Sequence, residues 1–143
     1  MSIEENKAVI RHFLEAGNKQ DLEAIGESLD PHCTISHLTR FGFFPTVEGY
    51  KPFLTSYFES LPDVHFTIED VVAEGEKVWV RLNIRGTHNG LLRNIPATGK
   101  KVSYTQIGMY RVVNGKIVDM DVYNDDMHLL RQLDAFPTFE PKS

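Results

Sequence analysis

The sequence predicts an α+β fold, in which helices grouped toward the N-terminus pack against a strongly curved antiparallel sheet. Apolar residues recur at helical spacing over much of the N-terminal part, whereas from His65 onward they alternate as they do in strands. The strand-like segments also follow one another through short turns, and strands joined in this way are antiparallel. Such a sheet, wrapped around helices, would enclose a cone-shaped cavity.

Length and composition restrict the class of protein. The 143 residues, 41% of them hydrophobic, suit a single domain spanning positions 1–143. No apolar run is long enough to span a bilayer and no signal-peptide pattern opens the chain, so we expect no membrane partner. The lone Cys33 cannot form an internal disulfide, which predicts a reducing, cytoplasmic setting. A net charge of −5, with scattered Lys and Arg, argues against nucleic acid as a partner.

The first half of the chain is expected to be mainly helical. A helix over 3–16 ends at Gly17, and Asp21 is a typical N-cap for a short second helix that runs through Leu29. A short strand over 32–38 follows, and a third helix over 49–61 ends before Pro62.

The segment 39–48 between them is an apolar loop. It contains Phe41, Phe43 and Phe44, and apolar loops of this kind roof a pocket or meet a partner chain.

The second half is expected to form strands. Asn114-Gly115 favours a tight turn, because both residues tolerate a positive φ angle. The expected segments are strands over 66–72, 78–86 and 101–113, a loop over 87–100, a last strand over 117–123 that runs into a helix, and a frayed tail over 138–143.

Most familiar site patterns are missing. The six histidines, at positions 12, 32, 37, 65, 88 and 128, show no metal-ligand spacing. There is no glycine-rich nucleotide fingerprint and no GxSxG serine elbow, and Cys33 suits a buried filler better than a nucleophile. We therefore expect no metal and no cofactor, which leaves acid–base chemistry by carboxylates and imidazoles.

Three carboxylates, Asp119, Asp121 and Asp125, share one strand parity if the last strand persists. In one interpretation the first two are solvated and Asp125 caps the last helix. In the other, this polar face lines a cavity, where apolar surroundings raise the pKa of an aspartate and make it a usable general acid or base. The pattern leaves both open.

Three segments together carry a family resemblance. They are GTHNGLLRNIPATGKKV at 86–102, MYRVVNGKIVDMDV at 109–122 and DMHLLRQL at 126–133. They resemble the SnoaL-like polyketide cyclase (ester cyclase) family, whose members read G-T-H-x-G, P-x-T-G-[RK], x-G-K-I and W-x-x-x-D-x-x-x-L-x-x-Q-L. The resemblance covers almost the whole chain. It implies a fold of the nuclear transport factor two-like or ketosteroid isomerase-like superfamily, a cystatin-like α+β roll.

The resemblance also implies a function. It suggests a small-molecule cyclase, lyase or isomerase that acts on a small apolar or polyketide-like ligand in an enclosed apolar pocket. The family's acid/base aspartate falls on Asp125, which would handle the proton of an intramolecular aldol ring closure. His37 and Gln106 would face the carbonyl or enolate oxygen. The candidate substrate-binding residues are His37, Gln106, Asp121, Tyr57 and His88, and the His88 loop has mainly a structural character.

One departure and two alternatives belong with this interpretation. Asp121 stands where the family has Trp, which removes a stacking surface for a flat substrate. Two other functions are compatible with the same fold, because a fold does not fix a function. One is a non-catalytic ligand-binding protein on the same cone, and the other is an interaction module that uses the Phe41–Phe44 loop.

A homodimer is also implied by the resemblance. The outward-facing residues of the 78–86 strand, which are Trp79, Arg81, Asn83 and Arg85, would form its interface. The alternative is that Trp79 covers its own domain and the arginines are solvated.

Overall fold

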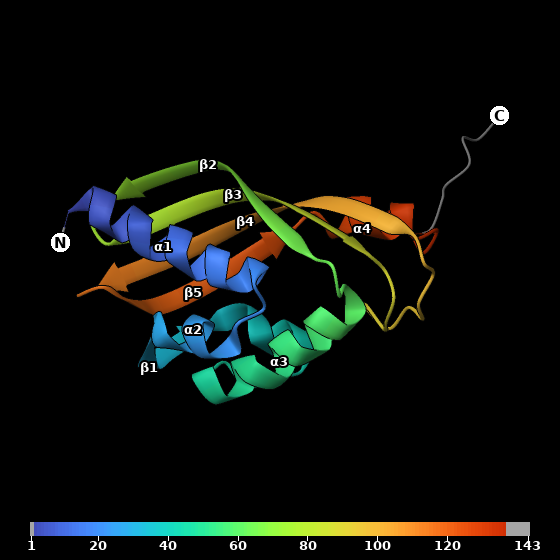
Figure 1. Cartoon of the computed structure of the whole chain (residues 1–143), viewed down its shortest axis with the longest axis horizontal. Coiled ribbons are helices and arrows are strands. Elements are labelled where there is room, and N and C mark those ends of the chain that lie inside the picture. Colours follow the sequence, from blue (N-terminus) through green and yellow to red (C-terminus); the bar gives the residue numbers. More distant parts are fainter. Residues whose placement is uncertain (1, 137–143) are drawn as a thin grey trace.

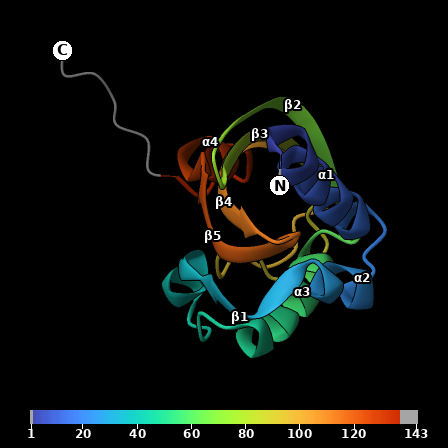
Figure 2. The ribbon, with the colours of Figure 1, turned by 90° about the vertical axis from the view of Figure 1, so that its left-hand side faces the viewer.

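A five-stranded sheet, curved but not closed, forms the body of the protein, and the first three α-helices pack inside its curve and below its edge (Figure 1, Figure 2). This computed structural model describes residues 2–136, so the tail expected over 138–143 lies outside the described residues. The predicted α+β class is confirmed. The strands lie in the order β1 (Leu29–Ile35), β5 (Lys116–Asn124), β4 (Lys101–Val113), β3 (Lys77–Thr87) and β2 (His65–Glu74).

Strands β2 to β5 form consecutive antiparallel hairpins, as their turn signals predict. Asn114 and Gly115 both have positive φ angles, 49° and 77°, which matches the tight turn expected there. The alternation of β3 is also confirmed. Val78, Val80, Leu82 and Ile84 are at most 1% exposed on the inner face, while Trp79 on the outer face is 47% exposed.

The first two helices begin at well-formed N-caps. α1 (Ile3–Asn18) starts with a reciprocal capping box between Ser2 and Glu5, and it buries Ile10, Phe13 and Leu14. α2 (Leu22–Glu27) starts at Asp21, whose side chain accepts a hydrogen bond from the backbone N–H of Ala24, as predicted. In Figure 2, α1 lies inside the arc of strands, so its buried face packs on the concave side of the sheet.

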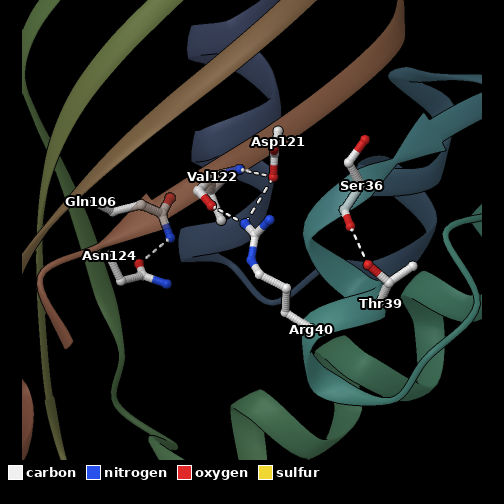
Figure 3. Close-up of polar contacts among 7 residues, drawn as sticks. All are labelled: Ser36, Thr39, Arg40, Gln106, Asp121, Val122 and Asn124. Carbon is white, nitrogen blue, oxygen red and sulfur yellow. Dashed lines mark hydrogen bonds and ion pairs between the residues drawn. The ribbon is translucent and has the colours of Figure 1, made fainter.

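The segment after α2 differs from its expected boundaries. The strand predicted over 32–38 begins and ends earlier as β1, and a 3-10 helix, η1 (Ser36–Phe41), follows it. Polar residues favour this turn, because the Thr39 hydroxyl donates a hydrogen bond to the Ser36 carbonyl (Figure 3). β1 pairs in parallel with β5, with Ile35 opposite Met120, and η1 continues past the end of that pairing.

Two further helices complete the fold, and only the first of them borders the cavity described below. α3 (Val47–Ser60) starts at its N-cap Thr46, slightly before the predicted boundary. α4 (Asp126–Gln132) follows β5 directly and is fixed to β4 by Gln132, whose side-chain amide bonds both the N–H and the carbonyl of Ser103.

Candidate active site

A cavity lies between the concave face of the sheet and the helices α1 and α3. It offers about 70 Å³ of space in which the centre of a water molecule fits. Most of its lining is aromatic or aliphatic, with Phe13 from α1, Phe53 from α3, Tyr110 from β4 and Met120 from β5. The phenylalanine loop contributes Phe41, so part of this loop does cover the cavity, as expected.

Polar groups reach this apolar lining from several distant parts of the chain. They are His37, Tyr57, Arg93, Tyr104, Gln106 and Asn124, besides the hydroxyls of Tyr50 and Tyr110. Within residues 2–136, no aspartate or glutamate belongs to the lining. Proton transfer inside the cavity would therefore fall to an imidazole or to phenols rather than to a carboxylate.

His37 is the most unusual of these groups. η1 holds it at 3% exposure, edge-on to the rings of Tyr50 and Phe53. Its Nδ1 atom is buried and has no hydrogen-bond partner among the described residues. Burial lowers the pKa of the imidazole to about 4, with the nearby Asp121 carboxylate opposing this and Arg40 reinforcing it. His37 is therefore neutral at pH 7, and a neutral imidazole can accept a proton or donate a hydrogen bond.

Two pairs of polar side chains face the same cavity. The hydroxyls of Tyr57 on α3 and Tyr104 on β4 are hydrogen-bonded to each other, and burial raises the pKa of both, that of Tyr104 to about 12. Both phenols are therefore protonated at pH 7 and can donate. On adjacent strands, the Gln106 amide nitrogen donates to the Asn124 side-chain oxygen at 2.9 Å (Figure 3).

Arg93 lies where the cavity meets a larger, more open groove. Phe41, Phe53, Tyr57 and Arg93 border both spaces, and the groove offers about 680 Å³ by the same measure. A ligand too large for the cavity would therefore extend into the groove past Arg93.

Three of the residues predicted to bind or act on a substrate do line the cavity. His37, Tyr57 and Gln106 come together from η1, α3 and β4. Asp121, His88 and Asp125 lie outside the lining, and the roles expected of them stay predictions.

Asp125 lies outside the cavity lining, exposed at the N-cap of α4. Its Oδ1 atom accepts a hydrogen bond from the backbone N–H of His128 at 3.1 Å. Of the two interpretations that the sequence left open, this position matches helix capping. The resemblance to the family's acid/base aspartate stays a prediction.

Asp121 points away from the cavity, because its neighbours Met120 and Val122 take the inward positions of β5. Arg40 reaches from η1 to the edge of β5, where its Nη2 atom lies 2.9 Å from the Asp121 carboxylate and also donates to the Val122 carbonyl (Figure 3). The residue that replaces the family Trp thus forms an ion pair that covers an otherwise open strand edge.

His88 is fully buried outside the cavity and holds the loop between β3 and β4 together. One ring nitrogen bonds the Thr98 hydroxyl at 2.9 Å and the other bonds the Ile95 carbonyl at 3.1 Å. Both ring nitrogens are thereby occupied within the loop, and the part of His88 in substrate binding stays a prediction.

The sequence interpretation missed Tyr104, Asn124 and Arg93. A signal existed for two of them: Tyr104 shares the strand parity of Gln106, and Asn124 sits opposite Gln106 in the register. For Arg93 we find no sequence signal, because it lies in a loop whose course only the folded chain reveals.

No group of three or more His, Cys, Asp or Glu residues in the described part of the chain is arranged to hold a metal ion. Among the helices of residues 2–136, none has the length and apolar character needed to cross a membrane.

Comparison with known proteins gives consistent matches. Residues 7–133 match the family described as SnoaL-like polyketide cyclase. The aklanonic acid methyl ester cyclase DnrD of Streptomyces peucetius is 40% identical over 139 residues, which is 92% of this chain and 93% of that protein. The nogalonic acid methyl ester cyclase of Streptomyces nogalater is 37% identical over 76 residues, 51% of this chain and 57% of that protein.

Solved structures show the same fold. TsrD from Streptomyces laurentii superposes with a TM-score of 0.85 at 24% identity, covering 95% of this chain and 99% of that chain. IdmH from Streptomyces antibioticus superposes with a TM-score of 0.79 at 29% identity, covering 90% of this chain and 98% of that chain. The cone-shaped α+β fold expected from the sequence is thereby confirmed.

Proposed function

Since the chain belongs to the SnoaL-like polyketide cyclase family, we propose that it closes a ring in a small polyketide-like substrate by an intramolecular aldol reaction. The relatives named above are cyclases of polyketide methyl esters. The observation that carries the proposal is the cavity, because it presents an apolar lining together with a neutral imidazole and several hydrogen-bond donors. No cofactor is needed when flanking carbonyls already acidify the reacting carbon.

The proposed reaction has three steps and returns its proton. A base removes the proton from the carbon between two carbonyl groups, and the negative charge moves onto an enolate oxygen. The enolate carbon then attacks a second carbonyl of the same molecule, which forms the ring carbon–carbon bond and an alkoxide. The conjugate acid gives the proton to the alkoxide, so substrate and product have the same composition.

Within the cavity, we assign the proton transfer to His37 and the stabilisation of the substrate oxygens to neutral hydrogen-bond donors. His37 is uncharged at pH 7 and its Nδ1 atom has no protein partner among the described residues, so a substrate group that reaches this nitrogen would satisfy it. The Gln106 amide and the Tyr57–Tyr104 hydroxyl pair are placed to donate to an enolate or carbonyl oxygen. Asp125 is the alternative base, supported by the family resemblance alone.

The first test uses aklanonic acid methyl ester and nogalonic acid methyl ester as substrates, with product followed by chromatography. We expect His37→Phe to lower kcat/KM by about a hundredfold or more, since general base catalysis contributes about 10²–10⁴ in rate. Asp125→Asn is the matched control, because Asn caps a helix as well as Asp and stability should be unchanged. A hundredfold loss in Asp125→Asn with an active His37→Phe would instead assign the base to Asp125.

A second candidate function is non-catalytic binding of a small apolar ligand. The absence of a carboxylate from the described cavity lining and the exposed position of Asp125 favour it. Binding of either ester without any turnover by the wild-type protein would support this function over catalysis.

We also propose that two copies of the chain pair through the outer face of the sheet. Val72, Trp79 and Met109 form a row across β2, β3 and β4, and the first two are 59% and 47% exposed. Beside the row, Arg111 bonds Glu76 and Asp119. A face with an apolar row and both signs of charge can complement itself about a two-fold axis.

A further inference from the structure

The ring closure proposed above assigns no role to Arg93. It is a cationic side chain at the junction of the cavity and the groove, 17% exposed, and the rest of the cavity lining is mainly apolar. A guanidinium carries five N–H donors and no acceptor, so each buried donor needs an oxygen partner. The hydrogen-bond partners of Arg93 therefore indicate what the junction can bind.

One side of the guanidinium is held by the protein and another is not. The Nη2 atom donates to the Asp126 carboxylate at 3.0 Å, and the Arg93 guanidinium lies over the ring of Phe41, 4.6 Å from its centroid. The Nε atom is buried and has no hydrogen-bond partner among residues 2–136. A buried donor without a partner is costly, and such exceptions often mark a site that a ligand completes.

The charge around Arg93 is also incompletely balanced. Asp126 is its ion-pair partner, and the Asp126 side chain is 45% exposed, so solvent weakens that pair. The groove holds a second cation, Arg40, whose partner Asp121 is not part of the groove lining. The positive charge of Arg93 reaches the cavity, since it opposes the rise in the pKa of Tyr57 and of Tyr104. The junction therefore favours a negatively charged ligand group.

The backbone around Arg93 is unusual and firmly held. Arg93 and Asn94 have φ angles of 49° and 62° and form a two-residue turn between Leu92 and Ile95, which bond each other in both directions. Asn and Gly commonly adopt a positive φ angle, whereas this backbone conformation is unfavourable for Arg. The buried His88 and the Ser60 hydroxyl, which donates to the Leu91 carbonyl, fix this loop from both sides. Strain of this kind is often found where a side chain serves a ligand.

We propose that Arg93 forms a carboxylate-binding subsite at the junction, so that the preferred ligands are aromatic or polyketide-like acids whose ring system enters the cavity. The ligand carboxylate accepts from the unpartnered Nε–H of Arg93, and the Tyr57–Tyr104 hydroxyl pair, which lines the same cavity, offers a second donor. This subsite rests on the proposed function, because it assumes that the cavity takes a small-molecule ligand. It adds a charge preference that the methyl ester relatives' names do not imply.

The test compares 1-naphthoate with its neutral methyl ester, two probes with the same ring system that differ in charge at pH 7.5. Binding is followed by the fluorescence of the naphthalene. We expect the wild-type protein to bind the acid at least about tenfold more tightly than the ester, which corresponds to a charge-assisted hydrogen bond. Arg93→Gln should abolish this preference while leaving the affinity for the ester within about twofold, which also shows that the variant is folded.

Asp126→Asn provides the matched control, because it breaks the same ion pair from the other side. If Arg93 binds the ligand carboxylate, this variant removes a competing anion and should tighten acid binding about two- to fivefold. If the ion pair merely fastens the loop, both variants should change acid binding in the same direction, and that result would overturn the subsite.

Failure of the subsite and failure of the proposed function are distinguishable in this experiment. Equal binding of acid and ester by the wild-type protein, unchanged in Arg93→Gln, would reject the carboxylate subsite and leave the cavity as a ligand site. No binding of either probe would reject the cavity as a site for ligands of this size, and the subsite with it.

Discussion

The burial of His37 supports the catalytic role proposed for it but lowers the stability of the fold. An imidazole with a buried nitrogen that lacks a partner among the described residues costs about 1–3 kcal/mol relative to a satisfied group. Replacement by Phe keeps the edge-on ring contacts with Tyr50 and Phe53 and removes the unsatisfied nitrogen. We expect His37→Phe to be at least as stable as the wild-type protein at pH 7 in urea unfolding, although it is impaired in turnover.

The same residue predicts how stability depends on pH. Because the pKa of His37 falls from 6.5 in the unfolded chain to about 4 in the folded protein, the unfolded chain takes up the proton first and acid favours unfolding. The wild-type protein should therefore lose stability between pH 6.5 and about 4, by roughly 3 kcal/mol in all, with no further loss from His37 below that range.

Comparing the two proteins isolates this contribution, since the other titrating groups are shared. The free energy of unfolding of His37→Phe should rise relative to that of the wild-type protein as pH is lowered from 7 to 4.5. A difference that stays constant with pH would show that His37 titrates normally.

At the scale of elements, the loop between β3 and β4 depends on a close approach to the end of α3. A Cβ atom on Gly90 would lie 2.6 Å from the Glu59 carbonyl oxygen, which is too close for any side chain. Gly90→Ala should therefore push the loop away from α3, lower stability by about 1–3 kcal/mol and displace Arg93 from the junction.

Gly26 in α2 supplies the control for this substitution, because a Cβ atom on Gly26 would have no other atom within 4 Å apart from its own chain neighbours and helix backbone. Gly26→Ala should raise stability by about 0.5–1 kcal/mol, as expected for Ala over Gly in a helix. In thermal unfolding, the unfolding temperature should fall for Gly90→Ala and rise for Gly26→Ala. Equal changes in the two variants would contradict the packing described for Gly90.

Elements with a strong local signal were predictable from the sequence, and elements fixed by distant contacts were not. The N-cap at Asp21 and the turn at Asn114-Gly115 depend on neighbouring residues alone, and both are confirmed. The end of β1 depends on where its pairing with β5 stops, which no local pattern in 32–38 shows.

The same distinction explains the site. His37 and Gln106 were identified from the family resemblance, and both line the cavity. The direction of the Asp125 side chain could not be predicted, because the strand ends one residue before it and strand parity no longer applies. Arg93 required the three-dimensional course of a loop.

At the scale of the whole molecule, the outer sheet face should control assembly. Trp79→Glu places a charge in the apolar row and should convert a dimer into a monomer, as measured by light scattering at micromolar concentration. Phe44→Glu is the control, because Phe44 is 79% exposed on the loop after η1, away from this face. A wild-type monomer, or a monomer only in Phe44→Glu, would reject the sheet-face dimer.

The parallel pairing of β1 with β5 has a consequence for how the protein is made. Leu29, near the start of the chain, pairs with Ile117, near its end, so β1 has no neighbouring strand until the last hairpin has left the ribosome. Contacts between such distant residues slow folding, because a long loop must close before they form. During synthesis, the side chains that will border the cavity remain without their final neighbours until β5 arrives, and this interval is when the nascent chain is most exposed to aggregation.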